Sequence, residues 1–323
     1  MRYYDVFNGD ADGLCALQQL RLADPIDSTL VTGLKRDIAL LHAVPAAGGD
    51  LVTVLDISLD RNRDALAALL ERGAVVHYFD HHYAGDVPQH PQLLAVIDES
   101  RAMCTSALVD RYLGGRFRAW AVVGAFGDGQ DDAAAALART LPLDATELAQ
   151  LRELGVNLNY GAYGQSAADV LVRPEDMFRI VSHYRDPLDL VREEPIIGRL
   201  GAERGADLER ALRGHVARTT PQADLWVLPD EAWARRVIGT FANRLATDEP
   251  HRAHAVLALR PDDACLVSVR SPRGRGPRAV DLCRRFPTGG GRAVAAGIDR
   301  LPPERLEEFV SAFESAWSGA LAA

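Results

Sequence analysis

The run LVTVLD, from Leu51 to Asp56, sets the fold class of this chain. It is a continuous apolar stretch bounded by Gly48-Gly49 on one side and by a polar turn on the other, which is typical of a strand buried on both faces. Such strands occur in parallel sheets that are covered by helices. The run therefore predicts an α/β fold, with an acidic residue at the carboxyl end of a central strand.

Short apolar runs alternate with helical patterns around this strand, which is the βαβ signature of a parallel sheet. Further strands are expected over 3–8, 28–33, 74–79 and 93–97, and helices over 13–23, 61–72, 104–113 and 120–126. The periodicity is helical from about 131 to 218. Strands return over 224–228, 253–259 and 264–271, with helices over 231–247, 278–286 and 303–319.

The length of 323 residues predicts about two domains at ~150 residues each. We expect an N-terminal parallel-sheet domain over 1–195, a helical linker over 196–220 and a smaller C-terminal α/β domain over 221–323.

Composition excludes several classes of protein. With 48% hydrophobic and 25% charged residues, the chain is neither disordered nor collagen-like. Its net charge of −9 repels long nucleic-acid duplexes, so a polyanion must bind through a local patch. Four scattered cysteines form no CxxC pair, which excludes a zinc knuckle and a disulfide framework. No apolar run reaches the length of a membrane span and no secretory signal begins the chain, so we expect a cytoplasmic protein without a membrane partner.

Acidic and histidine residues follow four of the predicted elements. The clusters are Asp10-Ala-Asp12-Gly13, Asp56-Ile-Ser58, Asp80-His81-His82 and Gly127-Asp128-Gly129. Each cluster alone is weak evidence for a functional site, because Asp-Gly, for example, is a common turn dipeptide. In open α/β sheets, however, ligands bind outside the carboxyl ends of the strands. We therefore expect one site to gather all four clusters.

Carboxylate oxygen with imidazole nitrogen is the ligand set of manganese, and less commonly of iron, cobalt or magnesium. Carboxylates gathered without cations repel one another, and a pair of divalent ions ~3.5–4 Å apart removes that repulsion. The pattern therefore predicts a hydrolase with two Mn²⁺ ions, with Mg²⁺, Co²⁺ or Fe²⁺ as alternatives. The chain has no P-loop, GxSxG or HExxH motif to indicate another hydrolase class.

The motifs and their order resemble those of the DHH phosphoesterase superfamily. The matching stretches in the first half are NGDADG (8–13), LDIS (55–58), FDHH (79–82), MCTSAL (103–108) and FGDG (126–129). Later, VSVRS (267–271) and GGGRAVAAG (289–297) resemble the DHH-associated C-terminal domain. The resemblance covers nearly the whole chain and implies a parallel-sheet catalytic domain followed by a smaller substrate-binding domain.

The resemblance implies a role for each matching residue of the first half. Asp10 is expected to bind one Mn²⁺ ion and Asp12 the other, with Asp56 bridging them. His81 and Asp128 are expected to complete the ligands of the second ion.

Two further residues are implied to act next to these ligands. His82 is expected to donate a hydrogen bond to the scissile phosphate or the leaving group, and Asp80 to orient the histidines. The chain also departs from the family pattern, with Val6 where many members have a histidine and Asn8 where the RecJ branch has an aspartate. We expect a weaker first metal site, closed by water or by Asn8.

The C-terminal signature departs as well, because Gly289, Gly290 and Gly291 precede Arg292 where the family usually has a histidine. Consecutive glycines let a backbone approach a phosphate, and an arginine adds a bidentate clamp; the alternative is a flexible turn with a solvated arginine.

An arginine-rich segment surrounds this signature. Between positions 270 and 292, seven arginines stand against one aspartate, Asp281, for a local charge of +6: Arg270, Arg273, Arg275, Arg278, Arg284, Arg285 and Arg292. Arg270 and Ser271 end a predicted strand and are expected to contact a substrate phosphate. Lys35 is the only lysine of the chain. The bidentate reach of arginine suits phosphate, but a GC-rich coding bias explains this excess of arginine over lysine more simply.

Together these features predict a manganese-dependent phosphodiesterase that cleaves linear or cyclic dinucleotides and short oligoribonucleotides to 5′-monophosphates. The alternatives are a RecJ-like 5′ single-strand exonuclease, a pyrophosphatase or exopolyphosphatase, and a catalytically silent nucleotide sensor. The expected partner is a small nucleotide or short oligonucleotide and not a long duplex. The oligomeric state stays open, with a homodimer as one alternative.

Overall fold

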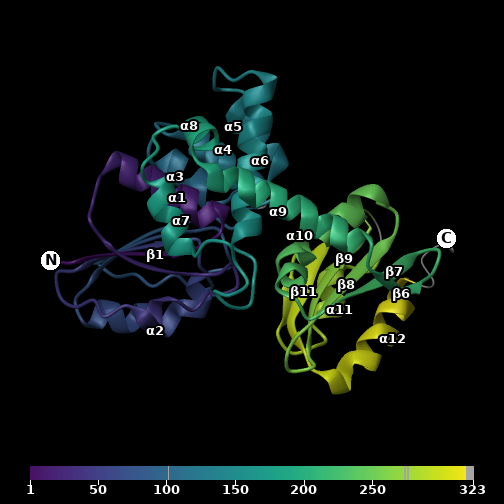
Figure 1. Ribbon diagram of the computed structural model, residues 1–323. Helices are drawn as coiled ribbons and strands as arrows, with labels where there is room; N and C mark the ends of the chain where they lie inside the picture. Colours follow the sequence, from purple (N-terminus) through teal and green to yellow (C-terminus); the bar gives the residue numbers. More distant parts are fainter. Residues whose placement is uncertain (101, 273, 275, 318–323) are drawn as a thin grey trace. The chain divides into compact units, whose positions relative to one another are not determined.

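The computed structural model describes residues 1–100, 102–272, 274 and 276–317. The chain forms two compact units, Met1–Ala202 and Glu203–Ala323 (Figure 1). Helix α9 (Pro195–Leu212) runs through the division and covers much of the stretch expected to be a linker. Arg273 and Arg275 of the arginine-rich segment, and the end of the last expected helix at 318–319, lie outside the described residues.

The first unit is built on a five-stranded sheet in which all neighbouring strands are parallel, as the sequence predicts. Its order is β2-β1-β3-β4-β5. The strands are β1 (Tyr3–Asn8), β2 (Thr29–Gly33), β3 (Leu51–Leu55), β4 (Val75–Asp80) and β5 (Leu93–Ile97). Because β2 and β3 lie on opposite sides of β1, the carboxyl end of β1 is the switch point at which ligands bind in open α/β sheets.

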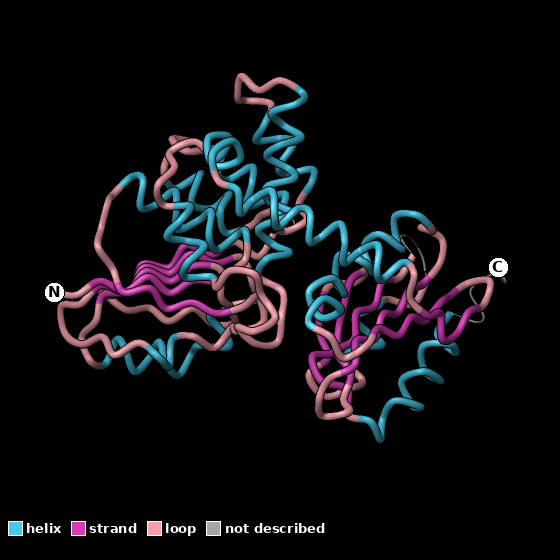
Figure 2. The backbone as a smooth tube through the Cα atoms, in the orientation of Figure 1, coloured by secondary structure: helices cyan, strands magenta, loops and turns pink. Residues whose placement is uncertain are grey.

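Helices cover both faces of this sheet (Figures 1 and 2). Helix α2 (Leu59–Glu71) and the short 3-10 helix η1 (Leu41–Ala43) pack on one face, where they bury Val6 and Val54. Helix α1 (Ala11–Ala23) and the helices that follow β5 cover the other face, where Phe7 and Leu55 are buried. Burial on both faces explains why β3 is a continuous apolar run.

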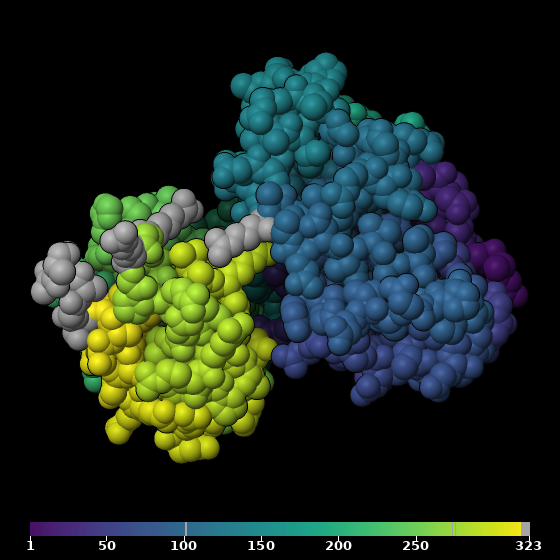
Figure 3. Space-filling model, turned by 180° about the vertical axis from the view of Figure 1, so that it is seen from behind, coloured from purple at the N-terminus to yellow at the C-terminus, as the bar shows by residue number. Residues whose placement is uncertain are grey.

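The helices after β5 form a bundle on the α1 side. They are α3 (Thr105–Tyr112), α4 (Arg118–Gly127), α5 (Asp131–Ala138), α6 (Ala145–Gly161), α7 (Pro174–Val181) and α8 (Pro187–Glu193). Trp120 of α4 is fully buried in this bundle. Helix α6 begins with a capping box between Asp144 and Glu147. Part of α5 and α6 projects from the unit (Figures 1 and 3).

The second unit contains a six-stranded mixed sheet with the order β10-β11-β9-β8-β7-β6. Strands β7 and β8 are parallel and the other neighbours are antiparallel. The strands are β6 (His215–Thr219), β7 (Ala223–Leu228), β8 (Ala253–Leu259), β9 (Cys265–Arg270), β10 (Gly289–Gly291) and β11 (Ala295–Leu301). The helices are α10 (Ala232–Asp248), α11 (Ala279–Cys283), η2 (Pro303–Arg305) and α12 (Leu306–Trp317).

One sequence prediction for this region is wrong. The periodicity predicts helix up to 218, but 215–219 is strand β6, because it pairs with β7 at the edge of the sheet. The glycine run forms β10 and pairs with β11, so it is not the flexible turn that was the alternative, and its contact with a phosphate stays a prediction. The four cysteines are free and buried, as expected. Within the described ranges, we find no helix with the length and apolar character needed to cross a bilayer.

Candidate metal centre

Three neighbouring strands deliver the acidic and histidine residues to one edge of the first sheet. Asp10 follows β1, Asp56 follows β3, and His81 follows β4. Asp12 lies in the first turn of α1, where its Oδ2 accepts a hydrogen bond from the backbone N–H of Thr105 at 2.7 Å. Asp12 Oδ1 accepts a second hydrogen bond, from the backbone N–H of Ser106, at 2.8 Å. Both donors lie at the start of α3. The convergence expected from strand order is therefore present.

Asp10 is the N-cap of α1. Its Oδ1 accepts hydrogen bonds from the backbone N–H groups of Asp12 (3.0 Å) and Gly13 (3.2 Å), which would otherwise lack partners at the helix start. Gly9 permits this tight turn, because a Cβ there would lie 2.2 Å from the carbonyl oxygen of Gly33. Asp10 is thus held rigidly at the end of β1.

Asp56 adopts a left-handed backbone conformation with φ of 60°. Aspartate tolerates this region better than most residues, and such strain is concentrated at functional sites. The turn carries the chain from β3 into α2. The Asp56 carboxylate accepts a hydrogen bond from Thr105 Oγ1 at 2.9 Å on Oδ1 and is almost fully buried.

His81 faces both carboxylates. Its Nε2 lies 3.5 Å from Asp56 Oδ1 and 3.9 Å from Asp12 Oδ2. Its Nδ1 lies 2.8 Å from the carbonyl oxygen of Met103. Because a carbonyl can only accept, Nδ1 carries the proton and Nε2 is the nitrogen able to bind a metal.

His82 and Asp80 form a second pair beside His81. His82 Nδ1 lies 2.7 Å from Asp80 Oδ1, and 43% of the His82 side chain is exposed. Asp80 is fully buried, and its Oδ2 has no hydrogen-bond partner among the described residues. Asp80 therefore orients His82, whereas His81 is oriented by Met103 and not by Asp80 as the resemblance implies.

The electrostatics of the cluster call for a cation. Burial, and then the charges of Asp12 and Asp10, hold the pKa of Asp56 well above its ordinary value. Burial alone lowers the pKa of His81, but the hydrogen bond and charge of Asp56, followed by the charges of Asp12 and Asp128, raise it to about 10. Carboxyl oxygens and one imidazole nitrogen are the donors that Mn²⁺ or Mg²⁺ binds, so these residues fit a divalent ion.

The donor atoms are also close enough to share an ion. One ligand atom from each of Asp56, His81 and His82 lies within 4.8 Å of the others. Asp128 caps the end of α4, is half-buried, and acts on His81 through its charge. It accepts a hydrogen bond from Gln130 Nε2 at 3.4 Å.

Lys35 is the site residue that sequence reasoning missed. Its Nζ forms an ion pair with Asp10 Oδ2 and donates a hydrogen bond to Asn159 Oδ1 at 3.0 Å. Burial opposes its charge, but Asp10, Tyr163 and Asp128 outweigh that effect and raise the pKa of Lys35. The sequence contains one signal for this residue, since Lys35 is the only lysine of the chain.

The two departures at the first motif have clear structural outcomes. Val6 is fully buried in the apolar core under α2. Asn8 stabilises the loop, because its Oδ1 accepts from the N–H of Asp10 at 3.1 Å and its Nδ2 donates to the carbonyl oxygen of Lys35 at 3.1 Å. Both polar ends of Asn8 are thus engaged in the loop, and this conformation does not favour the predicted role of Asn8 as a ligand.

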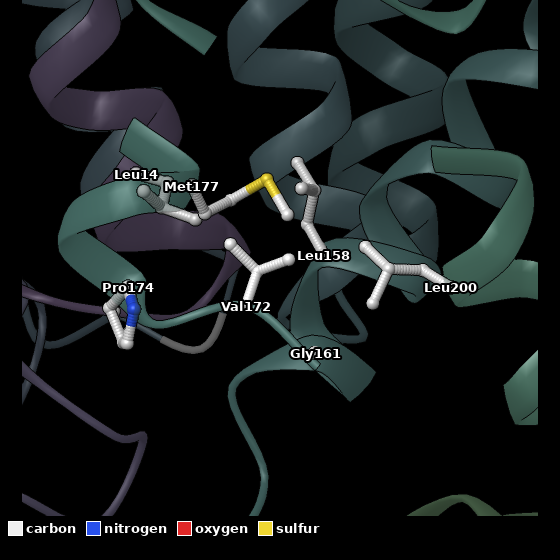
Figure 4. A pocket seen from close by; sticks show the side chains of 8 residues that line it. Leu14, Leu158, Gly161, Val172, Pro174, Met177 and Leu200 are labelled. Atoms are coloured by element: carbon white, nitrogen blue, oxygen red, sulfur yellow. The ribbon is translucent and has the colours of Figure 1, made fainter. Parts of the chain in front are cut away.

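The first unit also contains two cavities. One is an apolar cavity of about 10 Å³, lined by residues that include Gly9, Leu14 and Met177 (Figure 4). It has room for at most one water molecule. The other, about 690 Å³, is lined by residues that include Ala107 and Leu137. The linings of these two cavities contain none of the predicted metal ligands.

The predicted phosphate contacts lie in the second unit. Arg270 Nε donates to Asn243 Oδ1 at 2.7 Å, and its Nη1 donates to Ser268 Oγ at 3.0 Å. Ser271 is buried, and its N–H donates to the carbonyl oxygen of Val294 at 3.0 Å. Both residues are therefore bonded within this unit.

The glycine run serves packing at two of its three positions. A Cβ at Gly289 would lie 1.8 Å from the carbonyl oxygen of Cys283, and one at Gly291 would lie 2.6 Å from Ala296 Cα. A Cβ at Gly290 would meet no heavy atom within 4 Å. Gly290 has space beside it and Arg292 is exposed, so these two positions are the parts of the run that an anion could reach.

Comparison with known proteins identifies the fold. No family model matches the chain, and no curated protein matches it. The manganese-bound exonuclease RecJ is 20% identical, with a TM-score of 0.64 over 97% of this chain and 89% of that one. A DHH domain from a member of the s1p family of ribosomal proteins is 14% identical, with a TM-score of 0.67 over 97% and 86%. The pGpG-specific phosphodiesterase PggH from Vibrio cholerae is 14% identical, with a TM-score of 0.52 over 97% and 98%.

The likeness extends across both units of the chain. RecJ from Thermus thermophilus, in complex with Mn²⁺, is 19% identical, with a TM-score of 0.64 over 97% of this chain. This chain spans about half of that protein, 51% of its length. The fold implied by the motifs is therefore confirmed.

Proposed function

We propose that this chain, which has the fold of DHH phosphoesterases, is a divalent-cation-dependent phosphodiesterase acting on short nucleotides. The observation that carries the proposal is the approach of His81 Nε2 to Asp56 Oδ1 (3.5 Å) and to Asp12 Oδ2 (3.9 Å). In the metal-free protein a proton on His81 balances part of this charge, and a divalent cation among the same atoms would displace that proton and be bound by both carboxylates and the imidazole nitrogen.

Mn²⁺ is the ion we propose, with Mg²⁺ as the alternative. Solved RecJ structures of the same fold contain one or the other. When bound, the cation supplies an activated water and positive charge at the phosphoryl oxygens. The sequence predicts two Mn²⁺ ions, and Asp12, Asp56, His81 and Asp128 are the residues available for the second of them.

The chain's own residues have distinct tasks in this mechanism. Asp12 and Asp56 bind the ion, and the N–H groups at the start of α3 keep Asp12 in place. His82 donates a proton from Nε2 to the leaving oxygen while Asp80 balances the charge of its imidazolium. The buried Asp80 thus orients an acid that is itself partly exposed.

Electrostatics favour a short substrate. The chain carries a net charge of −9, and its basic residues are concentrated between 270 and 292. Arg278 of that segment is already paired with Asp281 at 2.7 Å, which reduces the charge left for a long polyanion. Gly290 and Arg292 are proposed to hold a distal phosphate of a linear or cyclic dinucleotide or short oligoribonucleotide. The products are 5′-monophosphates, and a cytoplasmic location remains a prediction.

A nucleotide panel tests this proposal. The full chain is incubated with Mn²⁺ and with pGpG, pApA or a 5′-labelled long single strand, and products are separated by chromatography. We expect mononucleotides from the dinucleotides, no product in EDTA, and no turnover by Asp12→Asn. Preference for the long strand would instead support the RecJ-like alternative.

Two other outcomes would replace the proposal. Hydrolysis of tripolyphosphate without nucleotide turnover would indicate a polyphosphatase. Nucleotide binding without any turnover would indicate a sensor.

A further inference from the structure

We infer that the ammonium group of Lys35 takes the place of one cation, so that the chain holds a single divalent ion at Asp12, Asp56 and His81. This inference rests on the proposed function, because it concerns the same centre. It differs from the two-ion site that the motifs predict.

Both carboxylate oxygens of Asp10 are already engaged by donors of the chain itself. Its Oδ1 accepts two backbone N–H groups, and its Oδ2 is paired with Lys35. Its side chain is 4% exposed. A divalent ion at Oδ2 would have to share that oxygen with an ammonium, and two cations at such a distance repel strongly in a buried site.

The Lys35 side chain is held in place and does not simply lie on the surface. Its N–H donates to the carbonyl oxygen of Ala162 at 3.1 Å, and its own carbonyl oxygen accepts from Asn8. Its Nζ also donates to Asn159 and lies 5.8 Å from the centre of the Tyr163 ring. The side chain is 27% exposed. Bonds from β1, from α6 and from the segment after α6 therefore fix the ammonium beside Asp10.

The residues around Asp10 also leave few other ligands for an ion. Position 6 is an apolar valine in the core under α2. Both polar ends of Asn8 are used within the loop. The charge of Lys35 compensates for the loss of these donors, because it neutralises Asp10 without requiring a coordination shell.

The geometry around His81 is different. Asp12 and Asp56 direct carboxylate oxygens toward His81 Nε2, and the charge of Asp128 also acts on this histidine. Asp12 and Asp56 also accept hydrogen bonds from neutral groups of the chain, but a neutral N–H or hydroxyl does not repel a metal ion. Within the described residues, no lysine is paired with either of them, whereas Asp10 is paired with an ammonium. The single ion therefore belongs on this side of the cluster.

Metal counting tests the inference directly. The full-length protein is dialysed against a range of Mn²⁺ concentrations, and the bound metal is measured by elemental analysis and electron paramagnetic resonance. We expect one Mn²⁺ per chain with the signal of an isolated ion. Two ions with a spin-coupled signal would overturn the inference and leave the proposed function standing. Absence of bound metal would overturn the proposed function, and the inference with it.

A matched pair of variants separates the two aspartates. Asp10→Asn keeps an N-cap side chain and is expected to retain one Mn²⁺ with less than about a threefold change in Kd, whereas Asp12→Asn is expected to retain none. Circular dichroism confirms that each variant is folded. A folded Asp10→Asn protein that has lost its ion would show Asp10 to be a ligand and would overturn the inference.

Removing the ammonium group of Lys35 should open the site beside Asp10 to a second metal ion. Lys35→Met keeps the length of the side chain without its charge and frees Asp10 Oδ2. We expect this variant to take up a second Mn²⁺ at high metal concentration, with spin coupling. A ratio that stays at one would show that the ammonium does not keep a cation out.

Discussion

Asp56 carries two unfavourable features at one position. Its backbone is left-handed, and its carboxylate is buried beside Asp10 and Asp12. Either feature costs free energy in the metal-free protein. Both features are explained if Asp56 is positioned to bind a cation, because the attraction between the carboxylate and the bound cation offsets the free energy lost to strain and burial.

The free-energy cost of the buried Asp56 carboxylate can be measured by substitution. Asp56→Asn keeps a side chain that tolerates φ of 60° and removes a buried charge. We expect the metal-free variant to be more stable by about 1 kcal/mol, or roughly 2–4 °C in Tm, because the cost of burying the carboxylate and its repulsion from Asp12 and Asp10 outweigh its attraction to His81. Mn²⁺ should raise the Tm of the original protein and not that of the variant. Thermal unfolding in EDTA and in Mn²⁺ measures both effects.

A variant less stable than the original protein in EDTA would contradict the account. It would mean that the Asp56 carboxylate stabilises the fold by itself, and that no cation is needed to explain its burial.

The second prediction concerns pH. In the metal-free protein, the pKa of His81 is about 10, because its carboxylate neighbours outweigh the effect of burial. His81 therefore holds an extra proton at neutral pH, and Mn²⁺ must displace it to reach Nε2. Affinity for Mn²⁺ should rise as pH rises from 6 toward 8.5, by up to about tenfold per pH unit for each proton released.

Calorimetry in two buffers of different ionisation enthalpy counts the released protons. An affinity that does not change over this pH range, with no proton release, would show that His81 is not displaced from its protonated form by the metal.

The carboxyl ends of the strands place the predicted metal ligands, and close packing between helices keeps the side chains of these ligands in position. Gly124 of α4 shows this, because a Cβ there would lie 2.2 Å from Ser106 Oγ and 3.2 Å from Asp12 Oδ1. Helix α4 can therefore pack against α1 and the start of α3 only with a glycine at this position.

The third prediction follows from this contact. In most helices, replacing glycine by alanine stabilises by up to about 1 kcal/mol. Gly124→Ala should instead destabilise by about 2 kcal/mol and weaken Mn²⁺ binding, because Ser106 and Asp12 must shift. Gly198→Ala in α9 is the matched control, since a Cβ there meets nothing within 4 Å. Equal effects of the two substitutions, measured by denaturant unfolding, would contradict this packing.

The sequence predicts these elements well where the signal is local. Apolar runs locate β1, β3 and β4, and strand order then brings Asp10, Asp56 and His81 together. Other features have no local signal. Strand β6 forms because β7 offers an edge to pair with. The ion pair of Lys35 with Asp10 joins positions 25 apart, and the positive φ of Asp56 appears only in the folded turn.

At the scale of the whole molecule, the two units carry different parts of the proposed chemistry. The predicted metal ligands are all in Met1–Ala202, and the predicted phosphate contacts are all in Glu203–Ala323. The second unit should therefore affect substrate binding more than the chemical step.

The fourth prediction tests this division. Arg292→Ala should raise the KM for pGpG about tenfold with little change in kcat, because a charge-assisted hydrogen bond contributes about 1.5 kcal/mol. Arg244→Ala is the control, since Arg244 is paired with Asp248 on α10, outside the 270–292 segment. Steady-state kinetics of both variants gives the comparison. A loss in kcat with KM unchanged would place Arg292 in the chemical step, and no change in either constant would remove it from the substrate site.

Asp12, Asp56 and His81 are proposed to bind one divalent cation jointly. X-ray diffraction from crystals soaked in Mn²⁺, recorded at the manganese absorption edge, would locate that ion. We expect an anomalous peak at about 2.0–2.2 Å from ligand atoms of these three side chains, with Lys35 still paired to Asp10. A fully soaked crystal with no manganese among these side chains would contradict this proposal.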